Sequence, residues 1–345
     1  MSFINLFRKK NRKLLFTTPS HSQKFCIVNK FRHFYSCDIS ETDAHNPETI
    51  LEEAQKKAAN IYGVNQTLFL TNGSSSGVIT GVLATTKRDE QVLIWSNAHR
   101  CHKNAVELAG ATPIYYDLPI IEEWGIPDKV TIEVLEPLLS QNKIKTVLIT
   151  SPSYYGIVSN VKEIKELCNK YNAYLIVDEA HGALYPFSEE LPESATKHAD
   201  ITVQSLHKTA GGLNPTALIH SNLSYDIKPY FDKITTTSPS YPLLASIEAT
   251  INYLNSKRGK YKIAQLISII KEIRKDCQNI KFYGDDITKI LIKKEGISGD
   301  ELSNILFNKY NIEDEITNNI STMLLTGIGT SKEKLNKLKK ALLKL

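Results

Sequence analysis

The sequence predicts an α/β protein: a mostly parallel β-sheet in a large domain, followed by a small α+β domain. Three observations carry this prediction. Short runs of Val, Ile and Leu recur along the first two thirds of the chain, helical segments alternate with them, and the pattern changes after about residue 240. Uninterrupted apolar runs are typical of strands covered on both faces, and their alternation with helices favours a parallel sheet.

The first 47 residues are expected to form an N-terminal arm. The opening MSFINLFRKKNRKLLF is basic and partly apolar, and its charges follow the first apolar residues. That order differs from a secretory signal peptide, which starts with its charges and continues into an apolar core. We therefore expect a surface helix or a disordered arm.

The large domain is expected over residues 48–245. Its first helix covers 48–63, where apolar residues recur at helical spacing before Gly63. A second helix is expected over 160–171. The predicted strands cover 91–95, 112–118, 145–150, 173–180, 200–207 and 216–220.

The small domain is expected over residues 246–345. Residues 248–276 predict one long helix or a broken pair of helices. The remaining elements are expected in the order strand, helix, strand, helix, over 281–294, 300–310, 321–329 and 332–345.

The composition indicates a folded protein of the cytosol. Of the 345 residues, 41% are hydrophobic and 23% are charged, and the net charge of +5 is spread along the chain, so nucleic acid is not an expected partner. No apolar run approaches the ~20 residues of a membrane span. The cysteines are odd in number and form no CxxC pair, which argues against a disulfide framework or a zinc site and favours a reducing compartment. No metal is expected.

Polar residues follow the predicted strands at their carboxyl ends, where ligands bind in open α/β sheets. The stretch ADITVQSLHKTAGG ends such a strand with Lys208. A buried ammonium is costly unless it is paired, neutralised or used covalently. Lys208 is therefore either a surface residue or a working amine. Asp178 ends the preceding predicted strand, so the two side chains are expected to lie on neighbouring strands.

The stretch TNGSSSGVITGVLATT joins a Gly/Ser-rich loop to an apolar helix. Free amides at a helix N-terminus suit a phosphate, although a serine cap on a flexible loop is the simpler alternative. VDEAHG also occurs in nucleoside triphosphatases, but these need a GxxxxGK[ST] loop. The one Gly-Lys pair, Gly259-Lys260, is followed by Tyr261, which excludes that class. A phosphate loop, a buried carboxylate and a lysine are the set that pyridoxal phosphate requires.

Several ordered motifs resemble the Orn/Lys/Arg decarboxylase family, whose members depend on pyridoxal phosphate and have the aspartate aminotransferase fold. The resemblance runs from about Thr17 to the C-terminus. Its motifs are PSHSQKF (19–25), DISETDAHNPETILEEAQ (38–55), FLTNGSSSG (69–77), AGATPIYY (109–116), TSPSYYGI (150–157), VDEAHGA (177–183) and QSLHKT (204–209).

The resemblance implies a role for each matching residue around the cofactor ring. Lys208 would form the Schiff base, and Asp178 would be the partner of the pyridine nitrogen. His99 would stack on the ring, and Ala180 would pack on its opposite face with His181 close by. From the residues alone, His99 is also compatible with a helix cap and His181 with a hydrogen-bonded core histidine.

The resemblance also implies a phosphate site. Ser205 and His207 would contact the phosphate together with Ser74, Ser75 and Ser76.

The chain departs from the family pattern at three places. Gly211, Gly212 and Pro215 follow the lysine motif and change a wall of the site, while Ser96 and Cys101 replace the outer residues of the RN-x-HKS turn. The additional C-terminal domain and the N-terminal wing of the longer relatives are not expected, so their large rings are not expected either.

Decarboxylation of arginine, lysine or ornithine is the expected reaction, by a cytosolic homodimer. No arginine follows Arg274 in the sequence, which argues against an aminotransferase that grips a carboxylate from its small domain. Arg32 and Arg100 keep that alternative open, together with lyase chemistry and a catalytically silent cofactor-binding subunit. Glu41, Asp43 and Glu179 are candidates for binding the distal cation of the substrate, or are solvated or capping carboxylates.

Overall fold

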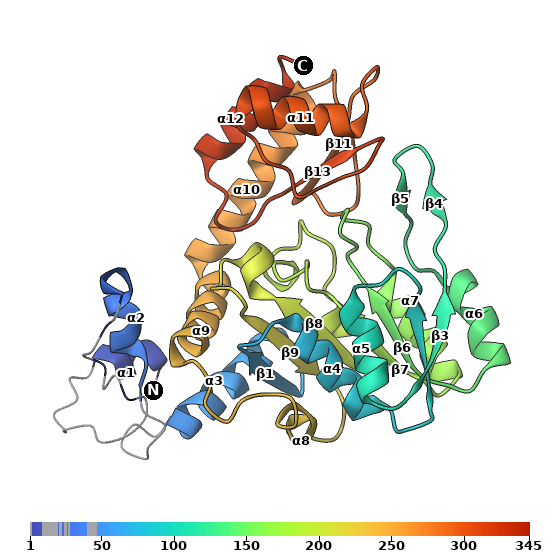
Figure 1. Cartoon of the computed structure of the whole chain (residues 1–345), viewed down its shortest axis with the longest axis vertical. Helices are drawn as coiled ribbons and strands as arrows, with labels where there is room; N and C mark the ends of the chain where they lie inside the picture. Colours follow the sequence, from blue (N-terminus) through green and yellow to red (C-terminus); the bar gives the residue numbers. More distant parts are fainter. Residues whose placement is uncertain (1, 9–19, 21–22, 24–25, 27, 40–46) are drawn as a thin grey trace.

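The computed structural model describes residues 2–8, 20, 23, 26, 28–39 and 47–345. A seven-stranded sheet forms the large domain, and a four-stranded sheet lies in the smaller body above it in Figure 1. The expected helix at 48–63 is α3, Pro47–Tyr62. Of the helices that the structure describes, none has both the length and the apolar character that a bilayer crossing needs.

The large sheet has the strand order β1-β9-β8-β7-β6-β2-β3. β9 runs antiparallel to its neighbours β1 and β8, while the other pairs are parallel. The predicted mostly parallel sheet is therefore confirmed, and β1 is a strand that the prediction missed. The strands are β1 (Gln66–Leu70), β2 (Gln91–Trp95), β3 (Thr112–Tyr116), β6 (Ile144–Thr150), β7 (Tyr174–Asp178), β8 (Ile201–Ser205) and β9 (Ala217–Ser221).

Helices cover both faces of this sheet. One face packs against α4 (Ser74–Thr85), α5 (Arg100–Leu108) and α8 (Lys228–Phe231), and the other against α6 (Ile132–Gln141) and α7 (Val161–Lys170).

Gly77 lets α4 lie close to the sheet. A Cβ atom at this position would stand 2.7 Å from Val203 Cγ1, closer than side-chain carbons pack. This contact holds the N-terminus of α4 near the carboxyl ends of the strands.

Two consecutive helices lead from the large sheet to the small one. α9 (Tyr241–Asn255) and α10 (Lys257–Asp276) are separated at Ser256, whose side chain accepts a hydrogen bond of 3.1 Å from the Gly259 amide. The long segment expected over 248–276 is thus a broken pair that begins at residue 241. The domain boundary expected between residues 245 and 246 falls within α9, and it stays a prediction.

The small sheet is antiparallel, in the order β10-β11-β13-β12. The single strand expected over 281–294 is wrong, because the chain turns at Gly284, which has a φ of 100°, and forms two strands. The elements are β10 (Lys281–Tyr283), β11 (Lys289–Lys293), α11 (Gly299–Tyr310), β12 (Ile316–Thr317), β13 (Thr322–Leu325) and α12 (Lys332–Leu342).

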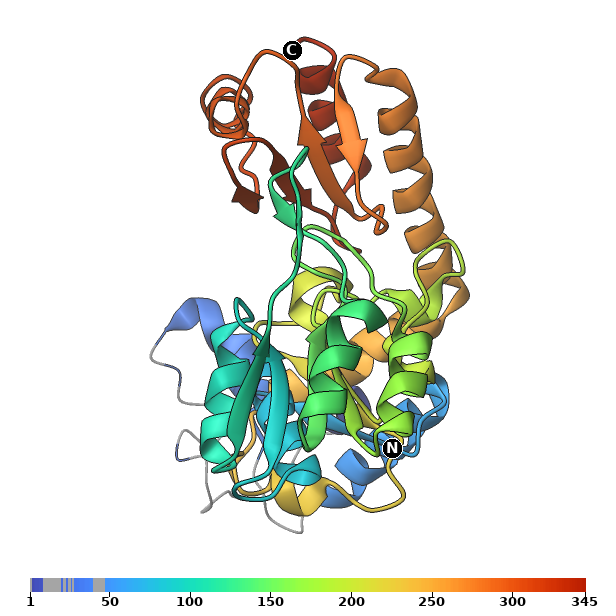
Figure 2. The same ribbon diagram turned by 90° about the vertical axis from the view of Figure 1, so that its right-hand side faces the viewer.

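A hairpin of the large domain reaches the small sheet. β4 (Ile120–Ile121) and β5 (Ile126–Pro127) rise beside it in Figure 2. Trp124 packs in one buried cluster with Leu291 and Met323 of the small sheet. The Trp124 carbonyl oxygen also accepts a hydrogen bond of 2.9 Å from Ser321 Oγ. The two sheets are therefore joined by this hairpin as well as by α9 and α10.

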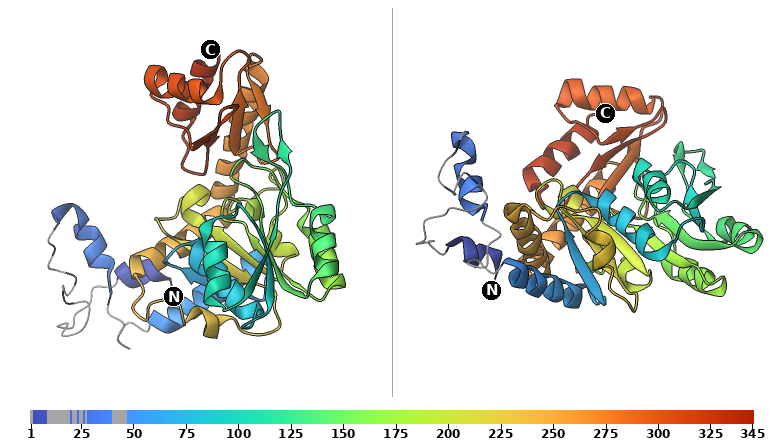
Figure 3. Two further views of the ribbon diagram at one scale, coloured as in Figure 1. Left: turned by 45° about the vertical axis from the view of Figure 1, so that its right-hand side comes forward. Right: turned by 60° about the horizontal axis from the view of Figure 1, so that its bottom comes forward.

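The N-terminal segment lies beside α9, as both views of Figure 3 show. α1 (Phe3–Arg8) buries Phe3 completely, and the Phe3 amide donates a hydrogen bond of 2.9 Å to Glu248 Oε2. The 3₁₀ turn η1 (Asn29–Phe31) precedes α2 (Arg32–Cys37), and each exposes one phenylalanine, Phe31 and Phe34 respectively. Of the two expectations for this segment, a helix is present over Phe3–Arg8, and its Phe3 is part of the core.

Candidate active site

Lys208 and Asp178 lie within electrostatic reach of each other at the carboxyl edge of the large sheet. Asp178 is the last residue of β7, and β8 continues into a π-helical turn, η4 (Leu206–Ala210), that carries Lys208. β7 and β8 pair directly, with Asp178 opposite Val203. The prediction that the two side chains belong to neighbouring strands is confirmed.

The Lys208 amine contacts an imidazole and an aromatic ring. Its Nζ lies 3.0 Å from His181 Nε2 and 5.6 Å from the centre of the Tyr154 ring. Burial lowers the pKa of Lys208, although the negative charges of Asp178 and other nearby acidic groups work in the opposite direction. The neutral, nucleophilic form of the amine is therefore more accessible than in a surface lysine.

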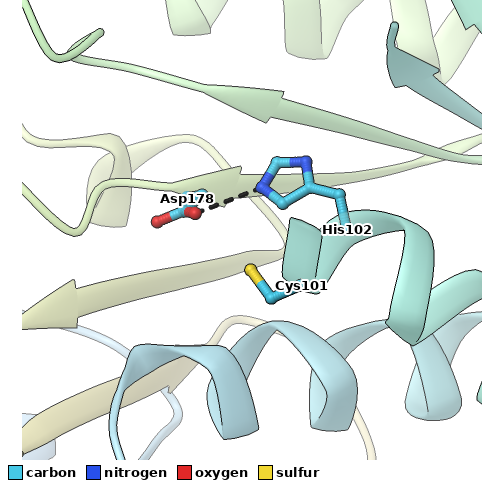
Figure 4. A group of neighbouring side chains, drawn as sticks. All are labelled: Cys101, His102 and Asp178. Atoms are coloured by element: carbon cyan, nitrogen blue, oxygen red, sulfur yellow. Dashed lines mark hydrogen bonds and ion pairs between the residues drawn. The ribbon is translucent and has the colours of Figure 1, made fainter. Parts of the chain in front are cut away.

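Asp178 is buried and held as a carboxylate by two donors. Oδ2 lies 3.1 Å from His102 Nε2 (Figure 4). Oδ1 accepts a hydrogen bond of 3.1 Å from the Ala180 amide. Burial by itself would raise the pKa of Asp178, but the hydrogen bond and charge of His102, with the charge of Lys208, lower it below its ordinary value. A buried carboxylate that stays ionised is suited to holding a proton on a ring nitrogen.

His102 was missed from the sequence, although a signal was present. It comes three residues after His99, and residues three apart lie on one side of a helix. Because α5 begins at Arg100, this spacing places the His102 side chain on the first helical turn after His99.

Cys101, His102 and Asp178 form a buried group whose sulfur, nitrogen and oxygen atoms all lie within 4.8 Å of one another (Figure 4). Such a trio has the donor types of a metal site. However, burial raises the pKa of the Cys101 thiol to about 12, and a thiol must lose its proton to bind a metal well. The direct hydrogen bond between His102 and Asp178 explains the arrangement without an ion.

His99 caps helix α5. Its Nδ1 accepts a hydrogen bond of 3.3 Å from the Cys101 amide. The capping role considered from the sequence is therefore present in the structure. The side chain is exposed at the edge that carries Lys208, and its stacking on a cofactor ring stays a prediction.

The serine loop places its hydroxyl groups in two different environments. Ser76 Oγ donates to Asn72 Oδ1 and to the Gly73 carbonyl oxygen, both at 2.7 Å, so it stabilises the loop itself. Ser74 and Ser75 open α4 and are partly exposed. Gly73 offers no side-chain cap, and the Ser76 amide donates a hydrogen bond of 3.2 Å to the Gly73 carbonyl oxygen. The amides of Ser74 and Ser75, at the start of the helix, are the ones suited to an anion.

The residues expected at the phosphate from the lysine motif lie on the same edge. Ser205 is completely buried, and its Oγ has no hydrogen-bond partner within the described ranges. His207 Nδ1 lies 3.0 Å from the Thr216 carbonyl oxygen, so its other ring nitrogen is left for a ligand. A buried hydroxyl without a partner is costly, and a phosphate oxygen would satisfy Ser205. The site residues therefore fit pyridoxal phosphate.

Glu179, open from the sequence between a substrate-binding carboxylate and a solvated or capping one, is buried away from solvent. It is 1% exposed and lies in the core beside Ser194 and Gln204. It accepts hydrogen bonds of 2.7 Å from Ser194 Oγ and the Ala195 amide, and of 2.5 Å from Gln204 Nε2. Burial raises the pKa of Glu179 to about 7. The other two candidates, Glu41 and Asp43, lie outside the described residues.

A different carboxylate comes from the small domain. Glu315 precedes β12, is exposed, and acts electrostatically on both Lys208 and Tyr154. Nothing in the local sequence of Glu315 predicts that the fold of the small domain brings its charge within electrostatic reach of Lys208.

The small domain also contacts the segments that carry His181 and Lys208. Lys289 Nζ donates a hydrogen bond of 2.6 Å to the His181 carbonyl oxygen and lies 2.6 Å from Asp286 Oδ2. The Ile328 amide donates a hydrogen bond of 2.8 Å to the carbonyl oxygen of Thr209. Both contacts tie the position of the small domain to the geometry of the site.

Comparison with known proteins places this architecture in a family. The profile described as Orn/Lys/Arg decarboxylase, major domain, matches residues 16–291. The chain belongs to this family. Membership confirms the resemblance stated from the motifs, and it implies the pyridoxal phosphate cofactor and the decarboxylase class expected from the sequence.

Two relatives illustrate the range of the match. An arginine decarboxylase of Halalkalibacterium halodurans is 29% identical over 96% of this chain and 74% of its own length. The constitutive lysine decarboxylase of Escherichia coli is 26% identical over 80% of this chain and 43% of its own length.

Solved structures confirm the fold. The E. coli constitutive lysine decarboxylase superposes with a TM-score of 0.83 at 20% identity, over 99% of this chain and 59% of that chain. An alanine–glyoxylate aminotransferase from Nostoc superposes with a TM-score of 0.67 at 13% identity, over 89% of each chain. The chain thus spans less than two thirds of the solved lysine decarboxylase and has the aminotransferase-like fold expected from the sequence.

Proposed function

We propose that this chain catalyses the pyridoxal-phosphate-dependent decarboxylation of a basic amino acid, with arginine as the first candidate. The observation that carries the proposal is the pairing of Lys208 and Asp178 at adjacent strand ends. One is a partly buried amine with a lowered pKa, and the other is a buried carboxylate that stays ionised.

The cofactor, when bound, supplies an aldehyde for attachment to amines and a ring that accepts the electron pair left when carbon dioxide departs. Lys208 would hold the cofactor covalently. Asp178 would keep a proton on the ring nitrogen, and His102 would keep Asp178 ionised and oriented. Ser205 and the free amides at the start of α4 would bind the phosphate.

Substrate selection is proposed to use Glu315. A carboxylate binds a guanidinium or an ammonium group through charge-assisted hydrogen bonds. Glu315 belongs to the small domain, and its negative charge acts on both Lys208 and Tyr154. Support for arginine comes from the relatives that match 95–96% of this chain, which are named arginine decarboxylases.

The test is to incubate the cofactor-loaded protein separately with arginine, lysine and ornithine and to identify products by mass spectrometry. We expect the amine formed by loss of carbon dioxide, most rapidly from arginine, and no product from Lys208→Ala. A keto acid in place of the amine would move the enzyme to transamination. No reaction with any of the three would overturn the substrate class.

We also propose a cytosolic homodimer, as the sequence analysis expects. All five cysteines are free thiols, which suits a reducing compartment.

Phe31 and Phe34 are 58% and 46% exposed on the N-terminal segment, so they are available to a second protomer. Light scattering should give twice the chain mass for the parent, and replacing both phenylalanines by serine should shift it toward the monomer. A monomeric parent would overturn this proposal.

A further inference from the structure

The imidazole of His181 forms a direct hydrogen bond with the Lys208 amine. Nε2 lies 3.0 Å from Nζ, and in the described part of the chain this is the side-chain hydrogen bond that Lys208 makes. With Lys208 Nζ as the donor, Nε2 accepts and the neutral ring carries its hydrogen on Nδ1. That Nδ1 is buried and has no described partner. The ring is thus oriented by Lys208 and by packing.

Groups from both domains hold the imidazole in place. The Tyr154 ring meets it edge to face, with ring centres 4.9 Å apart and an angle of 63° between the planes. Lys289 Nζ binds the His181 carbonyl oxygen at 2.6 Å and is itself completely buried. A base fixed in this way loses little free energy in reaching the geometry of proton transfer.

His181 also keeps a free lone pair near neutral pH. Burial, followed by the positive charges of Lys208 and Lys289, holds the pKa of His181 well below its usual range, while Asp178 acts in the opposite direction. The imidazole is therefore neutral, and the lone pair on Nε2 stays available to the Nζ hydrogens that it contacts. Tyr154 is less suited to accepting a proton, because burial raises the pKa of its phenol and keeps that group protonated.

We propose that His181 is a catalytic residue that transfers protons while Lys208 captures pyridoxal phosphate, a role that rests on the proposed function for the identity of the cofactor. The lone pair of the neutral amine forms a bond to the aldehyde carbon, and the carbonyl oxygen takes the π electrons. Nζ becomes acidic at that point. His181 Nε2 accepts one of the two Nζ hydrogens as a proton and passes it to the oxygen.

The second hydrogen follows the same path. As it leaves, the nitrogen lone pair forms a carbon–nitrogen double bond, and the oxygen departs as water. Both hydrogens of the amine end on the water molecule, so no further reactant is needed.

The experiment follows capture of pyridoxal phosphate by the full chain after removal of its cofactor. Absorbance in a stopped-flow instrument gives the rate, and borohydride reduction with mass spectrometry confirms attachment at Lys208. His181→Gln keeps a hydrogen-bond acceptor but cannot carry a proton, whereas His181→Ala removes both functions. General acid–base catalysis contributes roughly 10²- to 10⁴-fold, so we expect capture to slow about 100-fold in each variant.

Imidazole in the buffer should restore much of the rate in His181→Ala and leave the parent unchanged. His198→Gln is the matched control, because His198 pairs with Glu193 at the surface, and it should capture at the parent rate. Circular dichroism checks that each variant folds. If the alanine variant does not fold, His181→Gln alone decides.

Parent-like capture by His181→Gln would overturn the proposal. Failure of the decarboxylase assignment is separate, because capture involves no amino acid. If cofactor capture depends on His181 but no amino acid is decarboxylated, this inference stands and the proposed reaction is overturned. A protein that captures no cofactor would overturn both.

Discussion

His102 Nε2 lies 3.1 Å from Asp178 Oδ2, and both side chains are buried. This contact joins the first turn of α5 to the end of β7. It gives Asp178 a hydrogen-bond donor whose position is set by the helix, while Asp178 Oδ1 accepts a hydrogen bond from the Ala180 amide.

Removing His102 should therefore weaken Asp178 as an anion. His102→Leu loses the hydrogen bond and the charge that lower the pKa of Asp178, so the loss of activity on acidification should begin at a higher pH. Hydrogen bonds to charged groups contribute about 1.5–3 kcal/mol, so turnover at neutral pH should fall about 10- to 100-fold. The measurement is kcat as a function of pH.

His102→Gln is the control for this prediction, because an amide nitrogen can still donate to Asp178. It should recover part of the turnover and move the acidic limb of the profile back toward that of the parent. An unchanged profile in His102→Leu would show that Asp178 needs no imidazole.

Glu315→Gln should raise KM for arginine about 10- to 100-fold and change kcat much less. The substitution removes a charge near Lys208 and Tyr154 but keeps the side-chain size, so the predicted loss is confined to attraction of the substrate cation. Steady-state kinetics separate the two constants. Glu313→Gln removes an exposed carboxylate two residues earlier and should leave KM unchanged. Equal effects in both variants would point to overall charge.

Lys289→Met should destabilise the protein strongly. Lys289 and Asp286 form an ion pair in which both side chains are fully buried, and removing one member of such a pair costs about 3–5 kcal/mol. Urea unfolding should show the loss as a lower midpoint. The double variant Lys289→Met/Asp286→Leu should recover part of it, because no buried charge is then left alone.

Lys228→Met provides a comparison, since Lys228 and Asp232 form an ion pair that is about half exposed. Exposed pairs contribute little, so its midpoint should stay close to that of the parent. A similar small change in Lys289→Met would indicate that water reaches Asp286.

The centre of the site was predictable because local sequence determines it. Lys208 and Asp178 follow apolar runs, and parallel strands bring their carboxyl ends to one edge, so adjacent strands place these side chains together. The small-domain residues Glu315 and Lys289 were not predictable in the same way. Their positions depend on the break between α9 and α10 and on packing between the two sheets, which involve residues far apart in the chain.

Glu179 shows a different failure. It follows Asp178 directly, and successive side chains of an extended segment point to opposite sides. Because Asp178 faces the ligand edge, that alternation argues that Glu179 faces the core, where the structure has it.

The buried position of Glu179 gives a prediction about stability and pH. Burial raises its pKa to about 7 in the folded protein, whereas an unfolded chain has a value of about 4.3. The folded state therefore binds the proton more tightly. The associated stability is complete below the unfolded value and is lost as pH rises through about 7. Glu179→Gln, which does not titrate, should lack this loss.

The measurement is the difference in free energy of unfolding between parent and Glu179→Gln, taken at several values from pH 4 to pH 8. Relative to the variant, the parent should lose stability across this range. Taking the difference cancels buried His220, whose pKa burial lowers to about 3 and which acts in the opposite direction. A difference that does not change with pH would mean that Glu179 stays ionised in the fold, stabilised by its three hydrogen-bond donors.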